Sequence, residues 1–142
     1  MAVEYIDSPD CPASYGLCHG ILSGDEIIFT GTVKKRNKDF GINFLSGKNV
    51  VLHLYFRWTK EKIMKINSKI DIEWGEEIRL KNVLHRNQNF TLSIRVYPKY
   101  YKVTINGEHI SNVEHRQPYE SIQTVFIDGN VKIHKVLFTK FK

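Results

Sequence analysis

The sequence predicts an all-β fold, an antiparallel β-sandwich (jelly roll) of two sheets. Three observations lead to this prediction: apolar and polar residues alternate with a period of two, helical periodicity is almost absent, and turn residues separate short segments. About ten closely spaced strands without intervening helices favour antiparallel pairing. Two sheets packed face to face would give each strand one buried face and one polar face.

Each predicted strand rests on this alternation. In segment 90–96 (FTLSIRV) the four apolar residues point one way and the polar residues the other, and segment 101–105 (YKVTI) repeats the pattern. The segments are rich in Val, Ile, Phe and Tyr, which suit a pleated, half-buried surface. In chain order, the predicted strands are 26–33, 40–45, 49–57, 62–66, 70–73, 90–96, 101–105, 108–110, 121–127 and 130–138.

Two dipeptides between these segments predict tight hairpin turns. They are Asn106-Gly107 and Asp128-Gly129. Both tolerate the positive φ that a two-residue hairpin turn requires. Weaker turn signals of the same kind are Ser23-Gly24 and Ser46-Gly47.

Length and composition are typical of one globular domain of 142 residues. No apolar run approaches the roughly 18 residues of a membrane span, so we expect no membrane insertion. The first residues, MAVEYIDSPD, lack the basic and apolar regions of a signal peptide. The two cysteines, Cys11 and Cys18, would close only a small loop, which favours free thiols in a reducing compartment.

The formal net charge of +6 raises nucleic acid as a partner, but Lys and Arg are spread over the whole chain, which argues against it. The one basic run is 34–38 (KKRNK), between two predicted strands. It is interpreted as a solvated loop. The alternatives are a nuclear-localisation signal and a patch for an anionic surface.

Strand parity places a row of polar side chains on segment 50–57 (VVLHLYFR). The three apolar positions that alternate there must face the core. His53, Tyr55 and Arg57 then share the opposite face, spaced about 6.6–6.8 Å apart along the strand. The row therefore combines an imidazole, a phenol and a guanidinium group.

A second polar row follows on segment 74–80 (WGEEIRL). Parity puts Glu77 and Arg79 on one face, with apolar residues behind them. Trp74 lies among so many charged neighbours that we expect one face of its indole to stay free. If the two rows are neighbours, they form one patch with a carboxylate, two guanidinium groups, an imidazole and an indole.

This patch suits a sugar ring. Each hydroxyl needs a donor and an acceptor, which His, Asn and an Arg–Glu pair supply. The indole would cover the apolar face of a pyranose, contributing roughly 1–2 kcal/mol if about 50–80 Å² is covered. Taken singly, each of these residues is more often an ordinary surface or packing residue.

Enzymatic function is not expected. Glycoside hydrolysis needs two carboxyl groups on either side of a bond, and the patch contributes only Glu77. The sequence also has no Ser-His-Asp pattern and no metal cluster with recognisable spacing.

The polar residues resemble the signature of the galectins, which are β-galactoside-binding lectins. That signature is His-x-Asn-Pro-Arg on one strand, an Asn further on, and then Trp-Gly-x-Glu-x-Arg. The resemblance covers about residues 16 to 142 and implies one carbohydrate-recognition domain there, with 1–15 as an N-terminal extension. The chain reads HLYFR, INS and WGEEIR, so the matching residues are His53, Arg57, Asn67, Trp74, Glu77 and Arg79.

The resemblance implies a role for each matching residue on the concave sheet. His53 and Arg57 would bond the axial 4-hydroxyl of galactose, and Asn67 and Glu77 would bond its 6-hydroxyl. Trp74 would stack on the apolar face of the sugar. A network of Arg57, Glu77 and Arg79 would reach the next sugar.

The resemblance also implies no metal, no cofactor and galactose-containing glycans as partners. It implies a cytoplasmic protein that can leave the cell by an unconventional route. Edge strands of the sandwich can pair across a homodimer, as in some galectins.

One position departs from the galectin signature. Tyr55 stands where the motif has Asn, and Phe56 stands where it has Pro. Tyr55 either blocks the galactose subsite or offers its hydroxyl and ring to a different glycan. The sequence therefore predicts a galectin with altered specificity. The alternative is a galectin-like protein with weak or lost lactose binding that acts through protein contacts.

Overall fold

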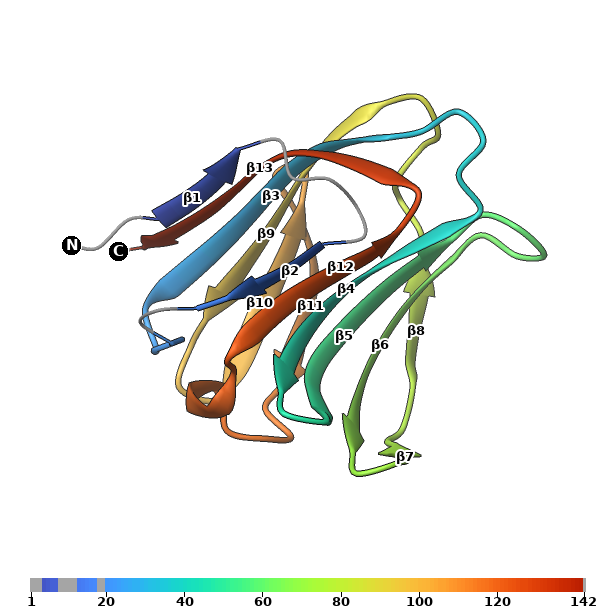
Figure 1. The fold of residues 1–142 in the computed structure, drawn as a ribbon. Helices are drawn as coiled ribbons and strands as arrows, with labels where there is room; N and C mark the ends of the chain where they lie inside the picture. The colour runs from blue at the N-terminus through green and yellow to red at the C-terminus, as the bar shows by residue number, and fades with distance from the viewer. Residues whose placement is uncertain (1–3, 8–12, 18–19, 142) are drawn as a thin grey trace.

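Two antiparallel sheets face each other in the computed structural model, which describes residues 4–7, 13–17 and 20–141 (Figure 1). The predicted all-β sandwich is confirmed. Sheet A has the strand order β1-β13-β3-β9-β10-β11. Its strands are β1 (Glu4–Asp7), β3 (Asp25–Val33), β9 (Asn89–Val96), β10 (Tyr100–Ile105), β11 (Glu108–Glu114) and β13 (Val131–Lys140).

Sheet B has the strand order β2-β12-β4-β5-β6-β7, and β8 also pairs with β6. Consecutive strands β4, β5 and β6 lie side by side in it, so their outward-facing residues form one continuous surface. The strands are β2 (Ala13–Gly16), β4 (Asp39–Ser46), β5 (Asn49–Arg57), β6 (Ile63–Ile70), β7 (Glu73–Trp74), β8 (Ile78–Lys81) and β12 (Thr124–Gly129).

Aromatic side chains fill the space between the sheets. Phe40 on β4 stacks on Phe56 of β5, with ring centroids 4.8 Å apart, and its ring lies 5.9 Å from Phe90 of sheet A. Strand parity assigned three alternate residues of β5 to the core, and all three are buried. They are Leu52, Leu54 and Phe56. Each such side chain contributes about 1.5–3 kcal/mol by leaving water, so this layer holds the two sheets together.

The hairpin turn predicted at Asn106-Gly107 is confirmed. β10 and β11 pair with Ile105 opposite Glu108, and the two turn residues have φ values of 51° and 81°. Asn and Gly adopt such angles at little cost, which is why this dipeptide closes the hairpin.

The hairpin predicted at Asp128-Gly129 is wrong. β12 pairs with β2 and β4 in sheet B, whereas β13 pairs with β1 and β3 in sheet A, so the chain crosses between the sheets here. Gly129 is needed for another reason. Its φ is 94°, and a Cβ atom there would lie 2.6 Å from the carbonyl oxygen of Asp39.

Several predicted strands have different limits: segment 62–66 continues to Ile70, and segment 108–110 continues to Glu114. Segment 70–73 is not a separate strand, because β6 continues to Ile70 and Asp71, with φ of 58°, then turns the chain into β7. Segment 121–127 becomes a strand only at Thr124, since a short 3-10 helix, η1 (Tyr119–Ser121), precedes it.

The N-terminal segment takes part in both sheets. β1 pairs with β13 at the edge of sheet A, and β2 pairs with β12 at the edge of sheet B. Part of the predicted extension 1–15 thus belongs to the sandwich, and the boundary at residue 16 stays a prediction. Cys11 and Cys18 lie outside the described residues.

Candidate functional site

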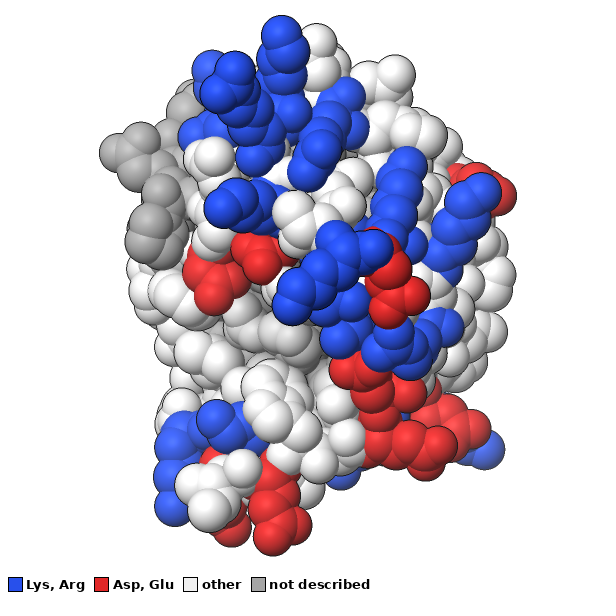
Figure 2. All heavy atoms as spheres, turned by 90° about the vertical axis from the view of Figure 1, so that its right-hand side faces the viewer, with Lys and Arg blue, Asp and Glu red and all other residues white. Residues whose placement is uncertain are grey.

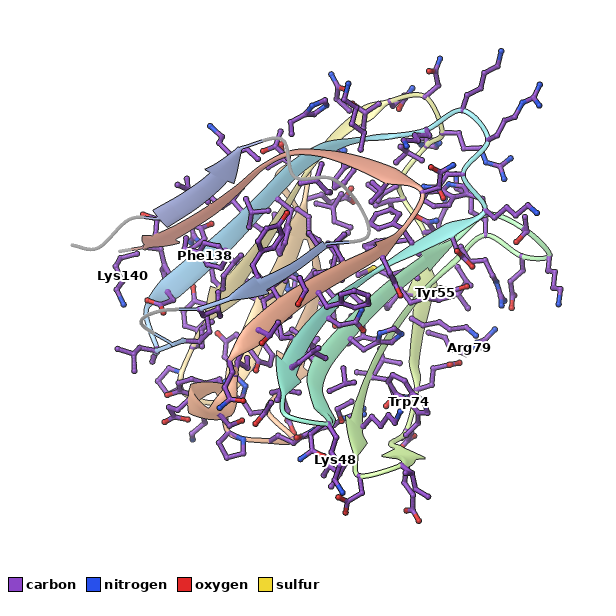
Figure 3. The ribbon with its side chains drawn as sticks, in the orientation of Figure 1. Lys48, Tyr55, Trp74, Arg79, Phe138 and Lys140 are labelled. Carbon is purple, nitrogen blue, oxygen red and sulfur yellow. The ribbon has the colours of Figure 1, made fainter. Side chains whose placement is uncertain are left out.

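A groove of about 700 Å³ runs over the face of sheet B that points away from the core. It brings together most of the residues predicted to bind a sugar. Figure 3 shows Tyr55, Trp74 and Arg79 on the same side of sheet B. The lining residues are Asp39, His53, Tyr55, Lys65, Asn67, Trp74, Gly75, Glu77, Asp128 and Gly129.

Two predicted residues, Arg57 and Arg79, do not line the groove. Both arginines make hydrogen bonds to one carboxylate, that of Glu61, at 3.3 Å and 2.5 Å. Arg79 also pairs with Glu77, with Nη1 to Oε2 at 2.6 Å, as parity predicts. Glu61, which sequence reasoning missed, therefore connects Arg57 to Arg79 and through it to Glu77.

The register of β5 sets the order of groups across the groove. His53 lies opposite Asn43 on β4 and Asn67 on β6. Tyr55 lies opposite Lys65 on β6. Side chains directly opposite in an antiparallel pair have Cβ atoms about 4.5–5.5 Å apart, so these groups can act on one ligand.

His53 is held as a neutral imidazole in one orientation. Its Nδ1 lies 2.5 Å from Oδ1 of Asn43, whose Nδ2 donates to the carbonyl oxygen of Phe126 at 3.3 Å. The amide thus presents its oxygen, so Nδ1 carries the proton and Nε2 is left as an acceptor. Burial lowers the pKa of His53, Lys65 lowers it further, and Glu77 opposes the shift.

Asn67 is buried and oriented by three groups. Its Nδ2 donates to the carbonyl oxygen of Gly75 at 3.0 Å, and its Oδ1 accepts from the backbone of Ser68 at 2.8 Å. Arg116 donates from Nη1 to the same Oδ1 at 2.8 Å and from Nη2 to the carbonyl oxygen of Glu76 at 2.6 Å. One amide hydrogen of Asn67 remains for a ligand.

Trp74 forms one wall of the groove. Its side chain is 49% exposed, and its ring centroid lies 4.8 Å from that of His53 at an angle of 54°. The Nζ of Lys69 lies 5.5 Å from the indole centroid. The indole therefore packs beside His53 and Lys69 and keeps enough open surface to stack on a ligand.

Glu77 completes this half of the groove as an oriented carboxylate. The hydrogen bond from Arg79, with the charge of Lys65 adding to it, lowers the pKa of Glu77, so the group is ionised at neutral pH. Lys65 Nζ lies 3.5 Å from Oε1 of Glu77. Because the pairs are partly exposed, they orient the carboxylate more than they stabilise the fold.

Tyr55 is tethered on the β4 side of the groove. Its hydroxyl donates to Oδ2 of Asp39 at 2.7 Å, and its ring lies nearly parallel to that of His53, with centroids 5.9 Å apart. Burial and the bond to Asp39 raise the pKa of Tyr55 to about 12, so the hydroxyl is protonated. Burial also raises the pKa of Asp128, which lines the same half of the groove.

Besides Glu61, four groups escaped sequence reasoning. Lys65 could have been found, because parity places it on the same face as Asn67. Asp39, Asp128 and Arg116 could not, because they come from segments whose place beside β5 and β6 depends on the sheet order. Within the described residues, no cluster of His, Cys, Asp and Glu could hold a metal ion.

A β-sandwich with a half-exposed indole beside an imidazole, an amide and an ionised carboxylate has the features of a carbohydrate-binding protein. A model of the galactoside-binding lectin family matches residues 12–138. The chain belongs to this family, the galectins, which are non-enzymatic lectins. The predicted family is confirmed.

Relatives and solved structures agree with this assignment. The chain is 38% identical to a Caenorhabditis elegans protein described as probable galaptin lec-8, over 96% of this chain and 77% of that protein. It is 34% identical to probable galaptin lec-7 of the same organism, with the same coverage. The crystal structure of the C. elegans galectin LEC-6 superposes with a TM-score of 0.89 at 21% identity, covering 95% of each chain, which shows the shared fold.

Proposed function

We propose that the groove of sheet B binds β-galactoside-containing glycans and that Tyr55 alters their selection. The observation that carries this proposal is that four of the six residues that match the galectin signature line one groove. Family membership supports the choice of galactosides. These residues are His53, Asn67, Trp74 and Glu77.

Each group has a role that its chemistry supports. His53 would accept from the 4-hydroxyl through Nε2. Arg57, which is bonded to Glu61 outside the groove lining, would have to turn toward the ligand to donate to the same hydroxyl. Asn67 would donate its remaining amide hydrogen to the 6-hydroxyl, which can in turn donate to Glu77. Trp74 would stack on the apolar face of the ring, in a contact of the order of 1–2 kcal/mol.

Tyr55 would reshape the site rather than fill it. Its hydroxyl is bonded to Asp39 on β4, whereas Asn67 and Trp74 lie on the β6 side of β5. The tether supports a ring that stands beside the galactose position. The glycan would meet Tyr55, Asp39 and Asp128 where its chain continues along the groove.

The second candidate is weak or lost lactose binding, with function through protein contacts. The specific observation in its favour is the bulk of Tyr55 in the middle of the polar row. The two candidates differ in what Tyr55→Asn does to lactose binding.

Calorimetric titration with lactose, together with a glycan array, tests the proposal. We expect the wild-type protein to bind galactosides and Trp74→Ala to bind them at least about tenfold more weakly, since 1.4 kcal/mol is one decade in Kd. Tyr55→Asn should change the rank order of glycans, and the control Tyr55→Phe, which removes only the hydroxyl, should change it less. No binding to any galactoside by the wild type, or equal binding by Trp74→Ala, contradicts the proposal.

The same titration decides the second candidate. If wild type fails to bind lactose and Tyr55→Asn binds it, Tyr55 is a block and function through protein contacts is favoured. Circular dichroism of each variant establishes that it is folded.

Cytoplasmic location with unconventional export, and a homodimer through edge strands, also stay proposals. Sedimentation velocity tests the dimer. Among the described residues, no helix is long and apolar enough to cross a bilayer.

A further inference from the structure

A strongly basic surface lies at one end of the sandwich, where three loops meet. They are the β3–β4 loop (34–38), the β5–β6 loop (58–62) and the β8–β9 loop (82–88). Figure 2 shows Lys and Arg side chains gathered across the upper part of the face that carries these loops. We call it the basic end surface. Its exposed cations are Lys34, Lys35, Arg36, Lys38, Lys60, Lys62 and Arg86.

Hydrogen bonds hold the three loops against one another. The backbone N–H of Trp58 donates to the carbonyl oxygen of Lys38 at 3.0 Å. The Nε of Arg86 donates to the carbonyl oxygen of Asn37 at 2.8 Å. The cations thus come from loops fixed in one arrangement, which lowers the entropic cost of binding a partner.

The positive charge of this end is not neutralised. Within the described part of the chain, none of its seven cations forms a salt bridge, and the one acidic residue of the three loops, Glu61, is paired with Arg57 and Arg79. The three loops account for the whole formal net charge of +6. A field of this kind attracts polyanions.

We propose that the basic end surface binds a sulfated polysaccharide of the heparin type. Sulfate groups need only cations and N–H donors, which the loops supply. The large apolar side chains exposed among the described residues all lie outside the three loops, so this end has no exposed apolar anchor for a membrane. Those side chains are Leu22, Ile70, Ile72 and Trp74.

The position of the surface beside the groove favours a glycan as the polyanion. Lys38 directly precedes Asp39, which lines the groove. A sugar chain can therefore extend from the groove onto the loops. This preference for a glycan rests on the proposed function, whereas the electrostatic binding does not.

Calorimetry with a heparin octasaccharide at about 0.15 M salt tests the proposal. The triple variant Lys35→Ala/Arg36→Ala/Lys38→Ala should bind about tenfold or more weakly and show a shallower salt dependence. The matched control removes three exposed or half-exposed lysines outside these loops, Lys99, Lys102 and Lys135. It should bind within about twofold of wild type, because charges beyond the screening length contribute little.

Titrations with other polyanions test whether the ligand is a sulfated polysaccharide. Fully desulfated heparin should not bind, and neither a DNA duplex nor phosphatidylserine vesicles should bind as tightly as heparin. Equal affinity for DNA or vesicles overturns the assignment to a sulfated polysaccharide, and an equal loss in the control variant overturns the assignment to this surface. Lactose titration distinguishes this proposal from the first: the triple variant should keep lactose binding, and Trp74→Ala should keep heparin binding.

Discussion

At the scale of single residues, the position of Arg116 shows how a side chain outside the groove can set its chemistry. Arg116 lies in the loop after β11 of sheet A, yet its guanidinium bonds Asn67 and the backbone of Glu76 in the groove wall. It fixes which end of the Asn67 amide faces the ligand. We regard Arg116 as a positioning residue.

Replacing Arg116 tests this role. Arg116→Ala leaves the buried Oδ1 of Asn67 without one partner, which costs roughly 1–3 kcal/mol, and should weaken galactoside binding about tenfold. Arg116→Lys should recover part of the loss. The side-chain amide signals of Asn67 in an NMR spectrum should shift in both variants. Arg95→Ala on sheet A, which removes a similar bond to Glu26, is the control and should leave binding unchanged.

His53 predicts the pH dependence of binding. Its pKa is lowered, so the imidazole is neutral at pH 7 and binding should be constant as pH falls from 8 to about 6.5, the ordinary His pKa. Binding should fall only at lower pH, as Nε2 becomes protonated and ceases to accept a hydrogen bond. A loss of lactose affinity that begins above the ordinary His pKa contradicts this assignment.

The lowered pKa of His53 also predicts how the free energy of unfolding changes with pH. The unfolded chain takes up a proton at His53 before the folded protein does, because the folded pKa is the lower one. The free energy of unfolding should therefore decrease as pH falls below about 6.5. His53→Gln should remove this contribution in urea titrations at a series of pH values.

At the scale of the elements, two glycines at or beside the ends of strands, Gly107 and Gly129, are needed for different structural reasons. Gly107 and Gly129 both have positive φ, but a Cβ at Gly107 meets open space, whereas one at Gly129 collides with the backbone of Asp39 and Phe40. Gly107→Ala should cost about 1–2 kcal/mol, from the backbone angle alone. Gly129→Ala should cost at least about 2 kcal/mol, because overpacking adds to the same strain.

Thermal unfolding of these two variants measures the difference. A similar decrease of stability for both would show that the chain at β12–β13 relaxes away from β4. Gly129 is also part of the groove lining, so Gly129→Ala should weaken glycan binding while Gly107→Ala should not.

Strand pairing explains what the sequence predicts well and what it does not. Alternation within β5 places His53 and Tyr55 on one face, and that prediction needs no knowledge of neighbouring strands. The crossover at Asp128-Gly129 and the approach of Arg116 depend on contacts between distant segments. A turn dipeptide predicts that the backbone can adopt the required φ, but it does not predict which sheet the next strand joins.

At the scale of the whole molecule, one aromatic layer joins the two sheets. Phe56→Ala should lower the free energy of unfolding by about 3–5 kcal/mol and the Tm by about 10–20 °C, because the buried ring stacks on Phe40 and its loss leaves a cavity. Ile72→Ala, which removes a side chain that is 87% exposed, should change stability by less than about 0.5 kcal/mol.

Both sheets should unfold together, since the core is shared. Near-ultraviolet and far-ultraviolet circular dichroism should therefore follow one thermal transition for wild type and Phe56→Ala alike. Two separate transitions would mean that sheet A and sheet B are independent units.

The two tryptophans lie in different environments, so the intrinsic fluorescence of the protein can report ligand binding. Trp58 packs against the core and donates its Nε1–H to the carbonyl oxygen of Leu84, whereas Trp74 stands half in solvent on the groove wall. A ligand that covers Trp74 changes the polarity around one fluorophore and leaves the other untouched. Intrinsic emission should shift to the blue on addition of sugar, without any label, and the spectrum of Trp74→Phe should stay fixed.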